Sequence, residues 1–385
     1  MTDDSKPGLQ TRSVHAGEPR PRIGDAVSMP IFQSSTFVLE GGESYHDLRY
    51  IRLNNTPNHR AVEAKLAALE ETEAALVTSS GMSAITNTLL AYLKPGDHLL
   101  AQNCLYGGSQ EFIAEILKEH QIEATFVSLE EPGEWQAGLR DRTRLFYVES
   151  TTNPLLEVGR LDQVPEFARG HDLVSIIDNT FPSPVNFRPV HMGYDLTIHS
   201  ATKYLNGHSD LCAGVVAGRR SEIDRIRELL NLTGGSLDPH PCALLHRGLK
   251  TLPLRVRAQN DSALALATAL AEHSAVEHVR YPGLPDDPAH ERAFAWFEGF
   301  GAMVTFTPAG GVEAADEILE RLEIPLVAPS LGGVETLVTR PATTSHAGLS
   351  PDDRRAMGIT DEMIRVSVGV EDAADLIADF RQALG

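Results

Sequence analysis

The chain has 385 residues, 42% of them hydrophobic, which is enough to fill the cores of about two or three domains. This composition excludes intrinsic disorder as a description of the whole chain. Lys and Arg total 33 against 53 Asp and Glu, so the formal net charge is −20. Phosphate backbones and anionic lipids would repel such a chain, so neither nucleic acid nor membrane is an expected partner.

The cysteines and the N-terminus indicate the compartment in which the protein works. Cys104, Cys212 and Cys242 are scattered without a CxxC spacing, which favours neither a disulfide framework nor a thiolate metal site. We therefore predict three ordinary core residues and no metal. The N-terminus is polar, and no apolar run reaches about 18 residues. These features predict a cytoplasmic protein that is not secreted and does not span a bilayer.

Composition divides the chain into three parts. Residues 1–56 are rich in Gly, Pro and Asn and lack periodicity, which predicts an extended arm that contacts a neighbouring subunit or its own domain. Residues 57–250 are predicted to form a large domain. Residues 251–385 are predicted to form a C-terminal domain that includes a linking helix.

After the arm, helical and apolar segments alternate. Short apolar runs predict strands at 74–78, 98–101, 124–127, 145–148, 173–177, 196–198 and 214–217. Such strands, separated by helices, indicate an α/β domain with a mostly parallel sheet that is covered on both faces.

The C-terminal third has a different pattern. Residues 241–273 are rich in Leu and Ala and are interrupted only at Pro253. This stretch predicts helices that link two domains. Strand-like segments at 302–308, 335–339 and 364–370 then alternate with helices. This order predicts a smaller α+β domain with an antiparallel sheet.

Two charged residues follow neighbouring predicted strands. Asp178 comes after the strand at 173–177 and Lys203 after the strand at 196–198, so both should emerge at the carboxyl edge of a parallel sheet, where open α/β sheets bind ligands. Either residue alone would be interpreted as an ordinary charged side chain exposed to solvent. Together with the flanking hydroxyls of Ser200 and Thr202, they suit pyridoxal 5'-phosphate, which needs an amine, a carboxylate for its ring nitrogen and a phosphate cradle.

A candidate cradle follows the strand at 74–78. Ser79, Ser80, Gly81 and Met82 open a predicted helix, whose N-terminal N–H groups can bind phosphate, and Gly81 permits close approach of the backbone. Taken alone, the same turn could be an ordinary helix N-cap.

Motifs along the whole chain carry a family resemblance. They are TRSVHAG, MPIFQSSTF, SSGMSAI, LKPGDH, YGGS, VESTTNPLLEV, DNTF, HSATKYLNGHSD, RGLKTLPLR, SLGGVETL and IRVSVGVED. The chain resembles the Cys/Met-metabolism family of pyridoxal-phosphate enzymes, which includes cystathionine γ-synthase, cystathionine γ-lyase, cystathionine β-lyase and methionine γ-lyase. The resemblance implies a fold-type I pyridoxal-phosphate-dependent transferase with a mostly parallel seven-stranded sheet and a smaller C-terminal α+β domain.

The resemblance also implies residue roles. Lys203 would form the Schiff base with the cofactor and move protons, Asp178 would pair with the ring nitrogen, and Tyr106 would stack on the ring. Further cofactor contacts would come from Gly81, Met82, Asn153, Ser200 and Thr202. Glu149 would support this group.

Other implied roles concern the substrate and a second subunit. Arg365 would clamp the substrate α-carboxylate in bidentate fashion, helped by Ser330 and Asn153. Tyr50 and Arg52 match a YxR motif that reaches the cofactor of the neighbouring subunit. The implied assembly is therefore a homo-oligomer with shared active sites, a tetramer built as a dimer of dimers.

Three departures from the family pattern bear on the substrate. The chain reads Asn55-Thr56-Pro57 where relatives read NPT. Pro329 stands where members that process cystathionine often carry Glu. Gly107 follows Tyr106, whereas methionine γ-lyases typically carry a Cys shortly after this Tyr.

These observations predict an enzyme that makes or breaks the Cγ–S or Cγ–O bond of homoserine-derived or sulfur amino acids, of the cystathionine γ-synthase or γ-lyase type. Alternatives are a cystathionine β-lyase, a methionine γ-lyase and, in another class, a non-catalytic protein that binds the cofactor.

Overall fold

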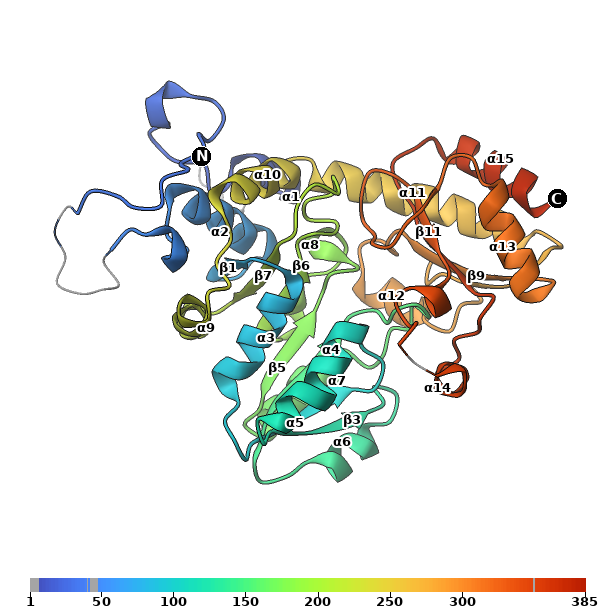
Figure 1. Cartoon of the computed structure of the whole chain (residues 1–385), viewed down its shortest axis with the longest axis horizontal. Coiled ribbons are helices and arrows are strands. Elements are labelled where there is room, and N and C mark those ends of the chain that lie inside the picture. The colour runs from blue at the N-terminus through green and yellow to red at the C-terminus, as the bar shows by residue number, and fades with distance from the viewer. Residues whose placement is uncertain (1–6, 40, 42–47, 349) are drawn as a thin grey trace.

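Two β-sheets organise the chain in the computed structural model, which describes residues 7–39, 41, 48–348 and 350–385 (Figure 1). The predicted arm therefore lies in part outside the described residues. The large sheet has seven strands and the small sheet five. The boundaries predicted at residues 56 and 250 stay predictions.

The large sheet has the strand order β1-β7-β6-β5-β4-β2-β3. Its strands are β1 (Ala74–Thr78), β2 (His98–Gln102), β3 (Glu123–Val127), β4 (Thr143–Glu149), β5 (Val174–Asp178), β6 (Leu196–Ser200) and β7 (Gly214–Gly218). Strand β7 runs antiparallel to β1 and β6, and the other pairs are parallel. The seven predicted strands and the mostly parallel sheet are confirmed.

Helices cover both faces of this sheet. They are α2 (Pro57–Glu70), α3 (Gly81–Tyr92), α4 (Gly107–Glu111), the π-helical η4 (Phe112–Ile116), α5 (Leu117–Glu119), α6 (Pro132–Gly138), α7 (Gln163–Gly170), α8 (Ser183–Asn186), η5 (Pro189–Met192) and α9 (Arg220–Thr233). Alternate strand residues face opposite sides. In β1, Ala75 and Val77 join the core beneath α2, while Leu76 joins the core beneath α3 and α9.

Two consecutive helices connect the sheets. Helix α10 (Pro239–Leu249) is followed by α11 (Leu252–Ala271), which crosses the top of the molecule in Figure 1. The predicted interruption falls at residues 250 and 251. Pro253 lies in the first turn of α11, where its missing N–H leaves no helical hydrogen bond unmade.

The small sheet has the order β10-β11-β12-β9-β8. Its strands are β8 (Val276–Arg280), β9 (Met303–Pro308), β10 (Leu326–Val327), β11 (Leu337–Thr339) and β12 (Ile364–Ser367), and its helices are α12 (His290–Trp296), α13 (Gly311–Arg321), η6 (Pro341–Thr343), α14 (Pro351–Ala356) and α15 (Ala373–Leu384). The expectation of an antiparallel sheet is wrong for one edge, because β10 and β11 are parallel. Strand β8 was not predicted because its sequence, VEHVR, is mostly polar.

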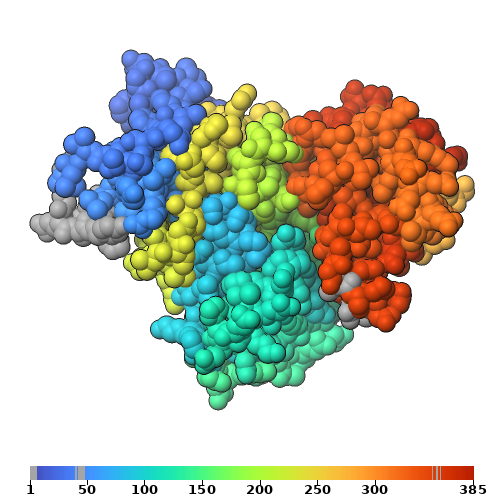
Figure 2. Space-filling model, viewed as in Figure 1, coloured from blue at the N-terminus to red at the C-terminus, as the bar shows by residue number. Residues whose placement is uncertain are grey.

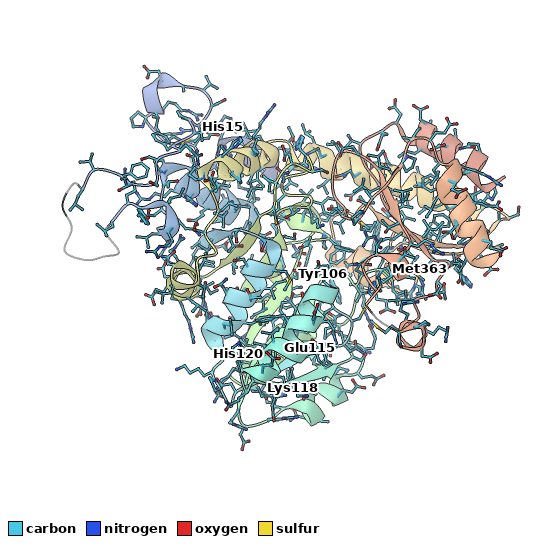
Figure 3. All side chains as sticks on the ribbon, viewed as in Figure 1. His15, Tyr106, Glu115, Lys118, His120 and Met363 are labelled. Carbon is cyan, nitrogen blue, oxygen red and sulfur yellow. The ribbon has the colours of Figure 1, made fainter. Side chains whose placement is uncertain are left out.

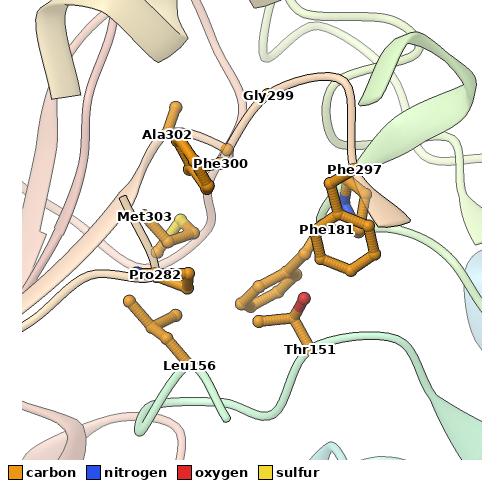
Figure 4. A pocket seen from close by; sticks show the side chains of 11 residues that line it. Thr151, Leu156, Phe181, Pro282, Phe297, Gly299, Phe300, Ala302 and Met303 are labelled. Carbon is orange, nitrogen blue, oxygen red and sulfur yellow. The ribbon is translucent and has the colours of Figure 1, made fainter. Parts of the chain in front are cut away.

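Mostly apolar side chains from the two halves of the chain meet around a small pocket (Figure 4). Phe181 and Thr151 come from the large-sheet side, and Phe300 and Met303 from the small-sheet side. Phe181 and Thr151 also line the larger cavity described below. The C-terminal half therefore packs directly against residues of the candidate site.

The N-terminal segment packs on this body at its first helix and then projects from it. Helix α1 (Leu9–His15) packs on α2, and the chain then runs outward through the short helices η1 (Ile23–Asp25) and η3 (Ile51–Leu53). Figures 1 and 2 show this blue segment projecting from the body. Among the described residues, no helix combines the length and apolar character that crossing a bilayer requires.

Candidate cofactor and substrate site

A cavity of about 630 Å³ lies at the carboxyl edge of the large sheet. Its lining includes Ser80, Gly81, Met82, Tyr106, Glu149, Thr151, Asn153, Asp178, Thr180, Phe181, Ser200, Thr202, Lys203, Cys212, Pro329, Ser330, Thr344, Ser345 and Arg365. Ten of the predicted cofactor and substrate residues thus share one cavity, although they come from both halves of the chain.

Asp178 and Lys203 come from neighbouring strands. Asp178 ends β5, and Lys203 lies in the turn after β6. Burial raises the pKa of the Asp178 carboxyl, while hydrogen bonds from Thr180 act in the opposite direction. The Thr180 N–H donates to Asp178 Oδ1 at 2.9 Å, and the Thr180 hydroxyl accepts from the Ser200 N–H at 2.8 Å. Thr180 therefore ties the two strand ends together.

The amine of Lys203 is oriented from the small-sheet side. Its Nζ donates to Ser330 Oγ at 2.7 Å. Burial, and secondly the charge of Arg365, lowers the Lys203 pKa to about 8. A neutral amine is a nucleophile and a proton acceptor, and this shift makes that form accessible near physiological pH.

Arg365 on β12 is buried and projects into the same cavity. Its Nη1 donates to Asn153 Oδ1 and its Nη2 to the Ser330 carbonyl, both at 3.0 Å, while its Nε is buried without a hydrogen-bond partner among the described residues. Burial lowers the Arg365 pKa to about 10. A buried guanidinium without a carboxylate partner is suited to bind a substrate anion.

Ser80, Gly81 and Met82 form the start of α3. Ser80 caps the helix, since its Oγ accepts from the Ser83 N–H at 3.0 Å. A Cβ on Gly81 would lie 2.9 Å from the Cβ of Ser200, so only glycine lets the helix N-terminus approach the end of β6 so closely. The N–H groups of a helix start and the Ser200 hydroxyl are donors suited to a phosphate.

Tyr106 lies at the mouth of the cavity, just before α4, near the centre of the molecule in Figure 3. Its side chain is 49% exposed, and its backbone N–H donates to Glu149 Oε1 at 2.7 Å. A Cβ on Gly108 would lie 2.9 Å from the Tyr106 ring and 3.0 Å from Met82 Sδ. Gly108, two residues after the tyrosine, therefore leaves room for the Tyr106 ring beside the start of α4.

These donors fit pyridoxal 5'-phosphate. One cavity contains an amine of lowered pKa, a half-buried carboxylate from the adjacent strand, a helix N-terminus with hydroxyls, and an aromatic ring. The described residues contain no group of three or more His, Cys, Asp or Glu side chains arranged to hold a metal ion.

Tyr50 and Arg52 do not line this cavity. Arg52 Nη1 donates to the Asn231 carbonyl of α9 at 2.7 Å, and its guanidinium lies 5.8 Å from the centre of the Tyr50 ring. Within one chain the two residues are thus separate from the other predicted site residues, and their role toward a second subunit stays a prediction.

Several lining residues escaped sequence analysis. Thr180 could have been found from the DNTF motif, but Thr344 and Ser345 lie in a loop after η6 that carries no motif signal. The expectation of three core cysteines is wrong. Cys242 is buried, whereas Cys212 is exposed and lines this cavity, and Cys104 lines a separate cavity of about 450 Å³.

Comparison with known proteins agrees with this geometry. The family model described as "Cys/Met metabolism PLP-dependent enzyme" matches residues 10–385. A cystathionine gamma-synthase of Mycobacterium leprae is 39% identical over 98% of this chain and 97% of its own length, and an L-methionine gamma-lyase of Fusobacterium nucleatum subsp. polymorphum is 38% identical over 99% of both. The crystal structure of a cystathionine gamma-lyase from Lactobacillus plantarum complexed with L-serine matches with a TM-score of 0.92 and 37% identity, covering 98% of each chain. The chain therefore belongs to the Cys/Met-metabolism family of PLP-dependent enzymes, and pyridoxal 5'-phosphate is its cofactor.

Proposed function

We propose that the protein makes or breaks the bond between Cγ and sulfur or oxygen in homoserine-derived or sulfur amino acids, as cystathionine γ-synthases and γ-lyases do. The observation that carries the proposal is the position of Ser330 between two charged groups. Its Oγ accepts from Lys203 Nζ at 2.7 Å, and its carbonyl accepts from Arg365 Nη2 at 3.0 Å. Amine and guanidinium therefore both contact Ser330, and an α-amino acid offers one group to each of them, because its amino and carboxylate groups are attached to the same carbon.

Bound pyridoxal 5'-phosphate supplies an aldehyde for the substrate amine and a ring that withdraws electrons from Cα. Lys203 would anchor the cofactor, and its Nζ, as a neutral amine, would accept the Cα proton of the substrate. Arg365 orients the substrate carboxylate, with Asn153 holding Nη1 in place. Asp178 provides the charge that pairs with the ring nitrogen.

Other residues hold the cofactor from its edges. The backbone N–H groups of Gly81 and Met82 would donate to the phosphate, and the hydroxyls of Ser200 and Thr202 would donate to it as well. Tyr106 would stack on the cofactor ring and help to exclude water from the reacting atoms.

We propose that the γ-substituent faces the part of the cavity lined by Pro329, Thr344 and Ser345, three residues without charge. They line the cavity beside Ser330, and none of them can form an ion pair with a distal ammonium group. We therefore propose an uncharged γ-substituent, such as the ester of an O-acylhomoserine or the thioether of methionine, in preference to the charged side chain of cystathionine.

A product assay tests the proposal. Cofactor-loaded protein is offered O-acetylhomoserine, methionine, cystathionine or cysteine, with and without cysteine as thiol acceptor, and products are identified by mass spectrometry. We expect 2-oxobutanoate, or cystathionine from the ester plus cysteine. Pyruvate without any γ-product would place the enzyme among β-lyases instead, and the absence of all turnover would favour a non-catalytic cofactor-binding protein.

We further propose a homo-oligomer, a dimer of dimers with shared sites, that acts in the cytoplasm. Tyr50 and Arg52 lie outside the chain's own cavity, and the projecting segment exposes apolar side chains such as Val27 (83%) and Val38 (87%). Arg52→Ala and Lys203→Ala should each be inactive alone, whereas subunits of both variants mixed and reassembled should regain part of the activity. Lack of any recovery in confirmed mixed oligomers would contradict shared sites.

A further inference from the structure

Two carboxyl groups lie side by side at the edge of the large sheet. Strands β4 and β5 are parallel neighbours, and their last residues, Glu149 and Asp178, are partners in register. Side chains of register partners project from the same face, and adjacent strands lie about 5 Å apart. Both residues line the cofactor cavity, and Glu149 is only 7% exposed.

Two negative charges on such a pair are unfavourable. Burial disfavours each charged form, and each carboxylate disfavours charge on the other. The hydrogen bonds decide which member keeps the proton. Asp178 accepts from both the N–H and the side chain of Thr180, whereas the Glu149 carboxyl accepts only from the Tyr106 N–H among the described residues.

We infer that Glu149 is a positioning residue which keeps its proton, so that Asp178 bears the single negative charge of the pair, and which holds Tyr106 in place through its backbone. The inference concerns the cofactor site of the proposed enzyme and is independent of which substrate bond is broken. A neutral Glu149 leaves Asp178 as the sole anionic partner for the ring nitrogen. It also accepts the Tyr106 N–H at the turn from which the ring projects.

Burial, followed by the charge of Asp178, raises the pKa of the Glu149 carboxyl well above its ordinary value, which agrees with this assignment. Other titratable groups interact with the pair from neighbouring elements. They are Tyr147 on β4, Cys104 after β2 and His199 on β6. Burial raises the pKa of Tyr147 and Cys104, so both stay neutral, whereas the electrostatic interaction with His199 lowers the pKa of Asp178.

Infrared difference spectroscopy tests where the proton lies, since a protonated carboxyl and a carboxylate absorb at separate frequencies. In the holoenzyme at neutral pH, Glu149→Gln should remove a protonated-acid band that Asp178→Asn retains. The control Glu298→Gln replaces an exposed carboxylate that is paired with Arg188, and it should leave the band unchanged. Isotope-labelled glutamate in wild type should shift the band, which keeps the test open should a variant fail to fold. A band that survives in Glu149→Gln, or that does not move with labelled glutamate, would overturn the inference.

A second readout separates a neutral from an ionised Glu149. Glutamine reproduces a protonated carboxyl, so Glu149→Gln should retain wild-type cofactor affinity within about twofold, while Glu149→Ala loses the Tyr106 contact and should bind cofactor about tenfold more weakly. Equal weakening in both variants would show that the charge of Glu149 is needed and would contradict a neutral acid. Both readouts need only the cofactor, so their failure is distinguishable from failure of the product assay.

Discussion

The two walls of the cavity are built differently. The cofactor wall consists of residues at the ends of regular elements, namely Gly81 at the start of α3, Asp178 at the end of β5 and Lys203 just after β6. The opposite wall, apart from Arg365 on β12, comes from irregular segments around Pro329 and Thr344. We therefore propose that the sheet edge carries the chemistry that the family shares, and that the loops carry the features that select a substrate.

The largest effect is expected at the rigid wall. Lys203→Ala removes both the covalent anchor and the proton acceptor, so turnover should fall by a factor of about 10³ or more. Steady-state kinetics and the visible absorbance of the bound cofactor provide the measurement. Lys118→Ala changes an exposed lysine far from the cavity (Figure 3) and serves as the control. Turnover within tenfold of wild type in Lys203→Ala would contradict the assignment.

A smaller effect is expected where the two walls meet. Arg365→Lys keeps the positive charge but loses the planar guanidinium, which can bind Asn153 and a substrate carboxylate at the same time. We expect this change to cost about 2 kcal/mol, or about 30-fold in kcat/KM. Cofactor affinity should change little, because Arg365 is assigned to the substrate. Arg321→Lys on the exposed face of α13 is the matched control. A loss of cofactor affinity as large as the loss in kcat/KM would disprove this division of roles.

Substrate preference should respond to the irregular wall. Pro329→Glu adds a carboxylate that can meet a distal ammonium group, so kcat/KM for cystathionine relative to O-acetylhomoserine should rise about tenfold, or about 1.4 kcal/mol. The control Pro329→Gln introduces a side chain of the same size as Glu but without the charge, and it should leave the ratio near that of wild type. The account of the neutral wall would fail if both variants shifted the ratio equally.

The smallest effect concerns pH. Because the folded chain lowers the Lys203 pKa to about 8, the amine becomes neutral as pH rises through about 8 rather than near its ordinary pKa of 10.5. The rate of covalent cofactor attachment to cofactor-free protein should therefore increase with an apparent pKa of about 8 and level off above it. Arg365→Met removes the positive neighbour and should move this midpoint upward. A downward shift would reverse the sign of the inferred interaction.

The difference between the walls also explains what could be predicted from the sequence. The seven strands of the large sheet are short apolar runs, and Asp178 and Lys203 follow two of them, so their meeting at one edge could be deduced from the topology of parallel sheets. The role of Arg365 depended on the family resemblance, since an Arg inside a strand has no local signature.

Other features were missed for physical reasons. Both residues of strand β10 are exposed, and the sequence of β8 is mostly polar. These strands are therefore defined by hydrogen bonding to their neighbours and not by a periodic apolar pattern that could be recognised in the sequence. Thr344 and Ser345 reach the cavity through the path of a loop that sequence patterns do not encode. The placement of Cys212 in the cavity has the same origin, because a lone cysteine has no pattern that separates a core position from a cavity wall.

The most direct test of the uncharged substrate wall is a competition assay. Wild-type holoenzyme receives equal concentrations of O-acetylhomoserine, methionine and cystathionine in one vessel, and consumption of each is followed by mass spectrometry, which gives the ratios of kcat/KM. The proposed wall of Pro329, Thr344 and Ser345 predicts that O-acetylhomoserine or methionine is consumed at least tenfold faster than cystathionine, about 1.4 kcal/mol. Preferential consumption of cystathionine would contradict it and would require a charged group from elsewhere to meet the distal ammonium.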